Sequence, residues 1–478
     1  MRYRYGKWVK NQRDEGKKPY LLMFLLSALM LAFSCVLQEG IAFYRQRGAE
    51  FTAAEYWLFF AIAAFLLLLC YALAIYYWRL RIRWGWAIFF FAIALGNSLA
   101  IWLFPAAVSG SVTRYWGEVQ AYSYSLGEMT RVRYHLDYLQ ACFLFYYLFA
   151  MLPHLLRSRR AFLPVFYGII AFALVAIGYS FFKDAAVYRV FFDRNRPADA
   201  SVYASSFFGN RNTYGTALLL GILSTAYVHI DRRYFWNYLL IGFQFFMLLF
   251  VFSKTALTLA IAFLLSFFLY RFFDNLAQGR RFKAIFLFLL VLAGAATFLY
   301  LDAQNLFLRG SVFDKLLASL RTSLSSYKSE GLKNRTEIWN ACLAFQKTHP
   351  LALWLGVGEQ NDYLLLAAMF GEPFGRLFFE HNGLIHQLFA GGLLRLACYA
   401  FIVCLFVYKN IAAIAKREKM GWISFLLLLT ILAHGIVETT SLLMPDTKGV
   451  VLLYMTLPLF VTQKKEGPTE EKKGLQAA

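Results

Sequence analysis

Long apolar runs separated by short polar stretches make up most of the chain. Each run holds about 18–25 residues with few charges, the length that a helix needs to cross about 30 Å of hydrocarbon. In lipid a segment must pair its own backbone polar groups, which favours helices over barrel strands that alternate over about 10 residues. The pattern predicts an all-α polytopic transmembrane helical bundle of about twelve spans, with residues 1–478 forming a single integral membrane domain. The expected spans are 20–38, 56–78, 84–108, 138–156, 161–182, 213–230, 234–252, 255–273, 284–301, 382–408, 422–443 and 449–462.

Basic residues gather in alternate connections between these spans. They occupy an N-terminal arm (residues 2–18), the stretches 79–83, 157–160, 232–233, 271–283 and 409–419, and a tail at 464–473. Short basic loops face the cytoplasm in membrane proteins. We therefore expect both termini to be cytoplasmic and the longer loops at 109–137, 183–212 and 302–381 to lie outside.

The 302–381 segment, between spans nine and ten, is the largest predicted extracytoplasmic loop. Its stretches Ile338–Phe345 and Tyr363–Phe370 have apolar residues at helical spacing. We expect two or three short helices there, lying on the outer face of the membrane.

Composition agrees with a membrane class. Hydrophobic residues make up 60% of the chain, against roughly 45–50% in soluble domains. The net charge of +21 would suggest nucleic acid in a soluble protein, but here it follows from the basic cytoplasmic loops, so no nucleic-acid partner is expected. Five of the six cysteines lie in apolar runs and none forms a CxxC pair, which indicates neither a disulfide framework nor a zinc site.

Four polar features interrupt this pattern on the predicted outer side, and each contains a candidate side chain. They are Gly209–Asn212, Ser253–Thr255, Asn334–Trp339 with the following Gly356–Gly358, and His381–Gly383. Taken singly, each candidate has an ordinary explanation. Arg211 and Lys254 could snorkel at the lipid boundary, Arg335 could be a plain loop arginine, and His381 could cap a helix or pack in a core.

Taken together, the features place Arg211, Lys254 and Arg335 on one side of the membrane with the imidazole of His381. Arginine and lysine suit a phosphate or diphosphate, and histidine suits proton transfer near neutral pH. The outer loops contain no Asp-x-Asp pair to hold a divalent ion on a diphosphate. We therefore expect chemistry without a metal or a cofactor.

The part of the chain from about residue 200 to residue 400 resembles the O-antigen ligase and Wzy-type polymerase superfamily of bacterial membrane glycosyltransferases. The resemblance rests on GNRNTYG from Gly209, the Ser253–Thr255 turn, NRTEIW from Asn334, HPLALWLGVG from His349 and HNGLIHQLFAGGLL from His381. It implies a multi-pass protein of the bacterial cytoplasmic membrane with its active site outside. Such enzymes move a glycan from a polyprenyl-diphosphate donor to a hydroxyl of a sugar, lipid or protein acceptor, without metal.

The resemblance also implies roles for single residues. Arg211, Lys254 and Arg335 would hold the diphosphate, and His381 and Arg335 would be catalytic, with His381 as the base for the acceptor hydroxyl or the group that orients it. Two residues depart from the family pattern. Lys254 stands where arginine is common, which removes a bidentate contact, and Glu380 stands where a small residue is usual.

Further polar residues are candidates for a supporting role. They are Asn210, Asn382, Glu380, His434 and Glu438. Glu380 either stabilises a charged His381 or is simply solvated. His434 and Glu438 lie one helical turn apart in span eleven, where an ionisable pair is either functional or a structural hydrogen bond. Arg395, in span ten, is expected to be paired inside the bundle.

Two questions remain open at the level of sequence. A polymerase that joins repeat units and a ligase that moves a finished glycan fit equally well. A transporter or flippase for polysaccharide or lipid-linked sugar also fits twelve spans with both ends inside. Such carriers tend to show repeat symmetry and charges at the membrane midplane, whereas here the longest loop is late and external, so the enzyme is favoured.

Overall fold

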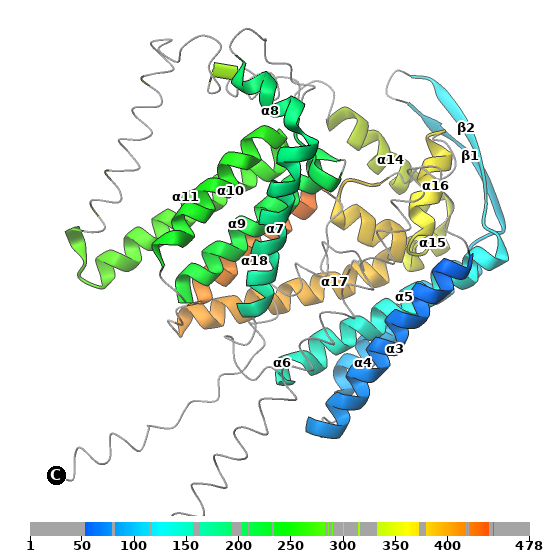
Figure 1. Cartoon of the computed structure of the whole chain (residues 1–478). Coiled ribbons are helices and arrows are strands. Elements are labelled where there is room, and N and C mark those ends of the chain that lie inside the picture. Colours follow the sequence, from blue (N-terminus) through cyan, green and yellow to red (C-terminus); the bar gives the residue numbers. More distant parts are fainter. Residues whose placement is uncertain are drawn as a thin grey trace, which may run out of the picture. The chain divides into compact units, whose positions relative to one another are not determined.

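The computed structural model describes most of the chain (Figure 1). The described residues are 53–78, 82–114, 117–155, 163–193, 203–208, 210–231, 234–282, 332–371, 379–416 and 420–438, with a few single residues besides. The chain divides into two compact units. Unit 1 comprises residues 1–162, 341–405 and 440–478, and unit 2 comprises residues 163–340 and 406–439.

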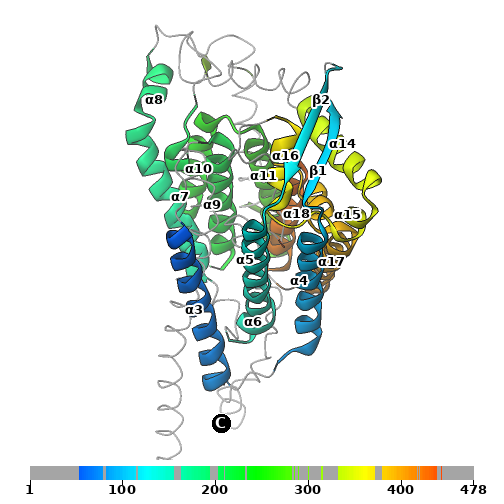
Figure 2. The ribbon, with the colours of Figure 1, turned by 90° about the vertical axis from the view of Figure 1, so that its right-hand side faces the viewer.

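Unit 1 joins helices from the start of the chain to segments near residue 360. Within it α4 packs against α5 and α15, and β2 packs against α16 (Figure 2). Its elements are α3 (Ala53–Trp78), α4 (Trp84–Leu103), β1 (Ala107–Thr113), β2 (Val119–Ser125), α5 (Glu128–Tyr146), the π-helical turn η1 (Tyr147–Met151), α6 (Leu152–Leu155), α15 (Pro350–Leu355) and α16 (Asn361–Met369). Two helices have residues in both units, α14 (Leu332–Thr348) and α17 (Gly383–Ala415).

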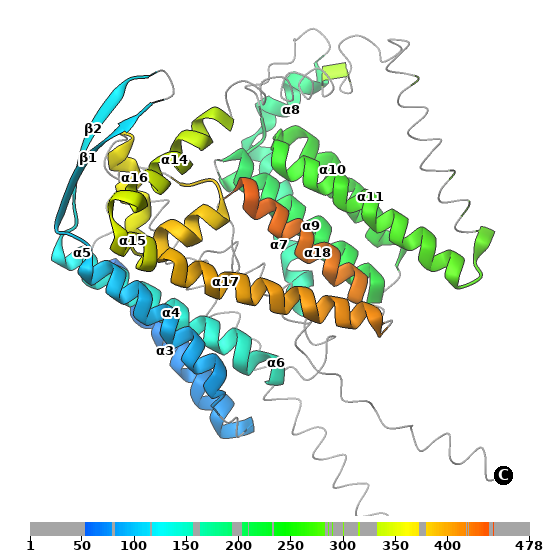
Figure 3. The same ribbon diagram turned by 180° about the vertical axis from the view of Figure 1, so that it is seen from behind.

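Unit 2 is built around α9, which packs against α7, α10, α11 and α18 (Figure 3). Its elements are α7 (Leu163–Lys183), α8 (Ala185–Phe192), the short 3₁₀ turn η3 (Ser206–Phe208), α9 (Arg211–Asp231), α10 (Phe235–Val251), α11 (Lys254–Ala277) and α18 (Gly421–Val437). Small residues on α9 permit the close approach, as they do in membrane helix pairs. A Cβ added at Gly215 would lie 2.5 Å from Ser253 Cβ, and one at Gly221 would lie 2.8 Å from Ala173 Cβ of α7.

The helices confirm a multi-pass membrane protein. Within the described part of the chain, six helices are long and apolar enough to cross a bilayer: Ala54–Tyr76, Trp84–Leu103, Val165–Lys183, Arg211–Ile230, Lys254–Ala277 and Gly383–Ala415. The helices α10 and α18 are apolar but shorter, at 17 residues each. The expected spans at 20–38 and 449–462, and nearly all of 284–301, lie outside the described residues.

The expected span at 138–156 differs from the structure at its start. Helix α5 begins ten residues earlier, at Glu128, and its first half contains Arg131, Arg133 and Asp137. Hydropathy could not identify this half because tertiary contacts stabilise it. The buried Arg131 guanidinium donates to the carbonyl oxygens of Ile101 (2.7 Å) and Phe104 (2.8 Å), which are left without helical partners where α4 ends.

A short antiparallel hairpin departs from the all-α prediction. Strands β1 and β2 pair from Ala107 opposite Ser125 to Thr113 opposite Val119, within and just before the loop expected at 109–137. The hairpin is joined to the rest of unit 1 by the Tyr124 hydroxyl, which donates to Asn361 Oδ1 at 2.5 Å. It therefore contacts the same segment that carries the buried ionic cluster described below.

The 302–381 segment contains three helices among its described residues, as expected. Ile338–Phe345 lies in α14 and Tyr363–Met369 in α16, with the six-residue helix α15 between them. Phe345 of α14 stacks on His349 with ring centroids 4.1 Å apart, so this histidine belongs to the junction between α14 and α15.

Helix α17 is broken rather than continuous. Gly392 has φ 65° and ψ −169°, so the carbonyl groups before it lose their helical donors. The N–H groups of Val357 and Gly358 donate instead to Phe389 O (2.9 Å) and Ala390 O (2.8 Å), and Gln346 Nε2 donates to Leu388 O (2.6 Å).

Glycines of the HPLALWLGVG and HNGLIHQLFAGGLL motifs allow the two backbone segments to approach closely at this junction. A Cβ at Gly356 would collide with the Ala390 carbonyl group, and one at Gly392 with the Trp354 carbonyl group. Gly356 also has φ 80°, a region that L residues rarely adopt. The LGVG and AGGLL segments are therefore two halves of one backbone junction.

Candidate functional site

The three expected cations all lie at helix starts in unit 2. Arg211 and Lys254 are the first residues of α9 and α11, and Arg335 lies in the first turn of α14. Asn210 caps α9, since its Oδ1 accepts the N–H of Asn212 at 2.8 Å. The arrangement puts two helix N-termini, with their partial positive charge, beside cationic side chains.

One carboxylate connects these helix starts. Glu438 Oε1 lies 3.3 Å from Arg335 Nη2 and also accepts from Asn212 Nδ2 at 3.3 Å. Arg335 Nη1 donates to the carbonyl oxygen of Val437 at the end of α18. The Ser253 hydroxyl, next to Lys254, donates to Asn212 Oδ1 at 3.4 Å. The structure thus brings together residues that are far apart in sequence: Asn212, Ser253, Arg335 and Glu438.

We call Arg211, Lys254, Arg335 and Glu438 the cation cluster. Lys254 is close enough to Arg211 for their like charges to repel, and the Arg211 guanidinium lies 5.2 Å from the centre of the Tyr203 ring. All three cations are partly exposed. Arginine and lysine side chains placed at helix N-termini are suited to binding an anion with more than one negative charge, such as a phosphate group.

His434 and Glu438 both contact α9. His434 Nε2 lies 3.1 Å from Thr216 Oγ1, one turn along α9 from Asn212. The backbone N–H of Glu438 donates to His434 O at 2.9 Å and ends α18. The pair predicted from their spacing therefore positions the end of α18 on α9, with Glu438 reaching into the cation cluster.

His381 belongs to unit 1 and stands just before α17. The cap of this helix is Asn382, whose Oδ1 accepts the N–H groups of Leu384 (2.9 Å) and Ile385 (3.1 Å). The interpretation of His381 as a helix cap is therefore wrong. His381 is partly exposed with φ 52°, and a non-glycine residue in this region is uncommon and worth a functional explanation.

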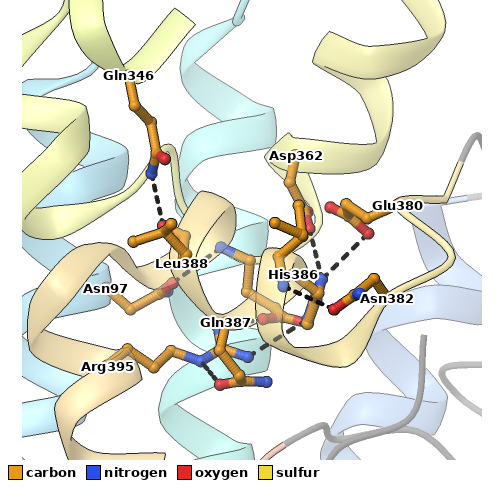
Figure 4. Close-up of polar contacts among 11 residues, drawn as sticks. Asn97, Gln346, Asp362, Glu380, Asn382, His386, Gln387, Leu388 and Arg395 are labelled. Carbon is orange, nitrogen blue, oxygen red and sulfur yellow. Dashed lines mark hydrogen bonds and ion pairs between the residues drawn. The ribbon is translucent and has the colours of Figure 1, made fainter. Parts of the chain in front are cut away.

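A buried ionic cluster lies next to His381 in sequence, and sequence reasoning missed most of it. Figure 4 shows His386 of α17 facing Asp362 of α16 and Glu380 of the segment before α17. His386 Nδ1 lies 2.9 Å from Asp362 Oδ2 and 3.3 Å from Glu380 Oε2, and His386 Nε2 lies 3.3 Å from Glu359 Oε1. All four side chains are at most 4% exposed.

Arg395 completes this cluster from beyond the break in α17. It donates to Gln387 Oε1 at 2.7 Å and to Glu359 Oε2, so the expectation that Arg395 is paired inside the bundle is confirmed. Glu380 is wholly buried beside His386, so the alternative of a solvated glutamate is wrong.

Burial raises the pKa of both Glu359 and Asp362, but their charged neighbours shift the two pKa values in opposite directions. Burial raises the pKa of Glu359, but Arg395 and His386 outweigh it and hold this pKa at about 2. Burial, and then the charge of Glu380, raise the pKa of Asp362 well above its usual value. Both effects disfavour a bare Asp362 carboxylate and favour a bound proton or another cation beside it.

Charged residues inside apolar stretches were the available signal for this cluster. His386 and Arg395 fall within the predicted span 382–408, and Asp362 directly precedes an apolar run.

No protein-family model matches the chain, and no curated protein matches it.

Proposed function

We propose that the chain is a membrane glycosyltransferase that moves a glycan from a polyprenyl-diphosphate donor to a hydroxyl acceptor. The observation that carries the proposal is the cation cluster, in which Arg211 and Lys254 begin two helices and Arg335 pairs with Glu438. A diphosphate is the kind of anion that arginine, lysine and helix N-termini bind. The family resemblance of Gly209–Gly215, Asn334–Trp339 and His381–Asn382 supports the same activity.

In this proposal the cations act on the leaving group. As the acceptor oxygen forms its bond to the anomeric carbon, the bond from that carbon to the diphosphate oxygen breaks, and the diphosphate takes the electron pair. Arg211, Lys254 and Arg335 stabilise the charge that develops there, which is the work a divalent ion does in other transferases. His381 removes the proton of the acceptor hydroxyl, a role that rests on the resemblance.

We place the protein in the bacterial cytoplasmic membrane, with twelve spans, both termini in the cytoplasm and the reaction outside. Single cysteines introduced at Ser325 and Gln278, in a variant without native cysteines, test this. An impermeant maleimide added to intact cells should label position 325 and not position 278. Labelling of position 278 alone would contradict the topology and the proposed site with it.

The cation cluster is tested with purified protein and its lipid-linked donor. Arg335→Ala should lower turnover by about 10²–10³-fold, the usual cost of removing one donor that stabilises transition-state charge, and should weaken donor binding as well. Arg189→Ala, at an exposed arginine of α8 in the same unit, is the matched control and should retain activity. Equal activity of both variants would refute the role of the cluster.

His381→Asn separates catalysis from backbone structure. Asparagine tolerates the positive φ at this position, and Asn382 provides the cap, so the variant should fold normally. Loss of a positioned base should lower turnover by about 10²–10⁴-fold while donor binding persists. An active, stable His381→Asn protein would show that His381 has no part in the chemistry.

A transporter or flippase is the second candidate, because a broken helix and buried charges are typical of transporters. In such proteins the freed backbone groups at the break bind the substrate or ion. Here Gln346, Val357 and Gly358 already pair the carbonyl groups before Gly392. Proteoliposomes distinguish the two: formation of a glycosylated acceptor supports the enzyme, whereas movement of the donor across the bilayer without product supports the carrier.

A further inference from the structure

The ionic cluster of unit 1 has a geometry that hydrogen bonds alone do not explain. Asp362 is wholly buried, yet neither of its carboxylate oxygens takes part in a hydrogen bond of acceptable geometry, and the same holds for His386 Nδ1. These atoms nevertheless lie 2.9 Å apart, and Glu380 Oε2 lies 3.3 Å from the same nitrogen. One ligand atom each of Asp362, Glu380 and His386 falls within 4.8 Å of the others. The three side chains converge on one point instead of aligning in pairs.

We propose that Asp362, Glu380 and His386 together bind one divalent transition-metal ion, with zinc the best match. An imidazole and carboxylates are zinc ligands, with bonds of about 2.0–2.2 Å. Two ligands on a tetrahedral ion with such bonds lie about 3.3 Å apart. The separations of 2.9 and 3.3 Å around His386 Nδ1 come close to this value.

The second ring nitrogen of His386 supports the assignment. A histidine that binds a metal through one nitrogen usually donates its other N–H to a carboxylate, which fixes the ring. His386 Nε2 lies 3.3 Å from Glu359 Oε1. It also lies 3.4 Å from Arg395 Nη2, but this guanidinium already donates to Glu359 and Gln387. With Nε2–H donated to Glu359, the lone pair of Nδ1 points at two carboxylates and needs a cation between them.

Charge balance permits the ion. With a neutral His386, the carboxylates of Glu359, Asp362 and Glu380 together with Arg395 sum to −2. One divalent ion brings this sum to zero. A neutral sum matters because an uncompensated charge at a wholly buried position is costly.

The ion would be structural and separate from the reaction. It would join α16, the residues just before α17 and the first turns of α17, and it would hold the segment that carries His381. The ligands are 0% exposed, so a chelator in solution does not reach them in the folded protein. The proposal does not rest on the transferase activity, because the diphosphate contacts belong to unit 2.

Metal content is the direct test. The full chain is produced without a histidine tag, purified in detergent without chelators, and analysed by inductively coupled plasma mass spectrometry. We expect about one zinc per chain in the wild type and background zinc in Asp362→Asn, which keeps the shape of the side chain. Asp137→Asn is the matched control, because it makes the same change at a buried aspartate of unit 1 whose oxygens are engaged by Tyr56 and Gln360. This variant should keep its zinc.

Two results would overturn the proposal. A wild type without metal, together with an Asp362→Asn variant of unchanged thermal stability, would show that a proton neutralises the cluster. If Asp362→Asn fails to fold, X-ray absorption spectroscopy of the wild type at the zinc edge decides instead, because it reports the atoms that coordinate the ion. A shell of nitrogen and oxygen with a single imidazole supports the assignment, and a sulfur shell or several imidazoles contradicts it. Neither readout depends on glycan transfer.

Discussion

The junction between the LGVG loop and the broken helix α17 predicts a large effect for one methyl group. Gly356 has φ 80° and ψ −170°, a region almost reserved for glycine that costs other residues about 1–3 kcal/mol. An alanine Cβ would also press on the Ala390 carbonyl group. This carbonyl must move, and two hydrogen bonds weaken with it, those from Val357 N–H to Phe389 O (2.9 Å) and from Gly358 N–H to Ala390 O (2.8 Å).

Each of those bonds contributes about 0.5–1.5 kcal/mol net, so Gly356→Ala should destabilise the protein by about 2–6 kcal/mol when the backbone term is included. Scanning fluorimetry of the purified protein in detergent measures the effect. At roughly 2 °C per kcal/mol for a large chain, the apparent Tm should fall by about 4–12 °C.

Gly178→Ala is the control for this experiment. Gly178 lies inside α7, and a Cβ there meets nothing within 4 Å. Alanine at this position should leave the Tm unchanged or raise it, because glycine is the poorer helix former by about 1 kcal/mol. A Gly356→Ala protein as stable as Gly178→Ala would refute the argument that the loop and the helix break fit together as described.

Three further predictions concern stability. Asn382→Ala should cost about 1 kcal/mol as the cap of α17 is lost, whereas Asn382→Asp, which still caps, should keep a Tm near that of the wild type. Arg131→Gln should lower the Tm and cost about 3 kcal/mol, because carbonyl groups at the end of α4 lose a charged donor. The pKa of Glu359 is held at about 2, below its ordinary value of 4.5. The stability it confers is therefore present above about pH 4.5 and lost as the pH falls towards 2, and a Glu359→Gln protein should show a flatter decline in Tm over that window.

The sequence predicts best those elements whose length the bilayer dictates. The helices α3, α7 and α9 begin within three residues of the expected spans at 56, 161 and 213, because an apolar run that crosses lipid must be helical. The first half of α5 carries Arg131, Arg133 and Asp137, and its stability comes from contacts with α4 that no local pattern contains.

The candidate site can also be predicted only in part: the sequence identifies several of its residues but not the contacts between them. Arg211 and Lys254 stand out because cations at span boundaries are costly, whereas Arg335 lies in a loop and is selected by the NRTEIW motif that carries the family resemblance. Their connection through Glu438 is not readable, since Asn212 and Arg335 are 226 and 103 positions from it. His386 inside a predicted span is a visible signal, but its partners Asp362 and Glu380 are distant in sequence or unremarkable, and only the fold brings the three side chains to one point.

The break in α17 also has a consequence for biosynthesis. The amides of Val357 and Gly358 emerge from the ribosome before their acceptors at Phe389 and Ala390 do, and those acceptors lie in a span that must still enter the membrane. The Gly356–Gly358 loop therefore waits with its N–H groups solvated until α17 has been inserted. Closure of this junction is therefore a late step in the folding of the chain.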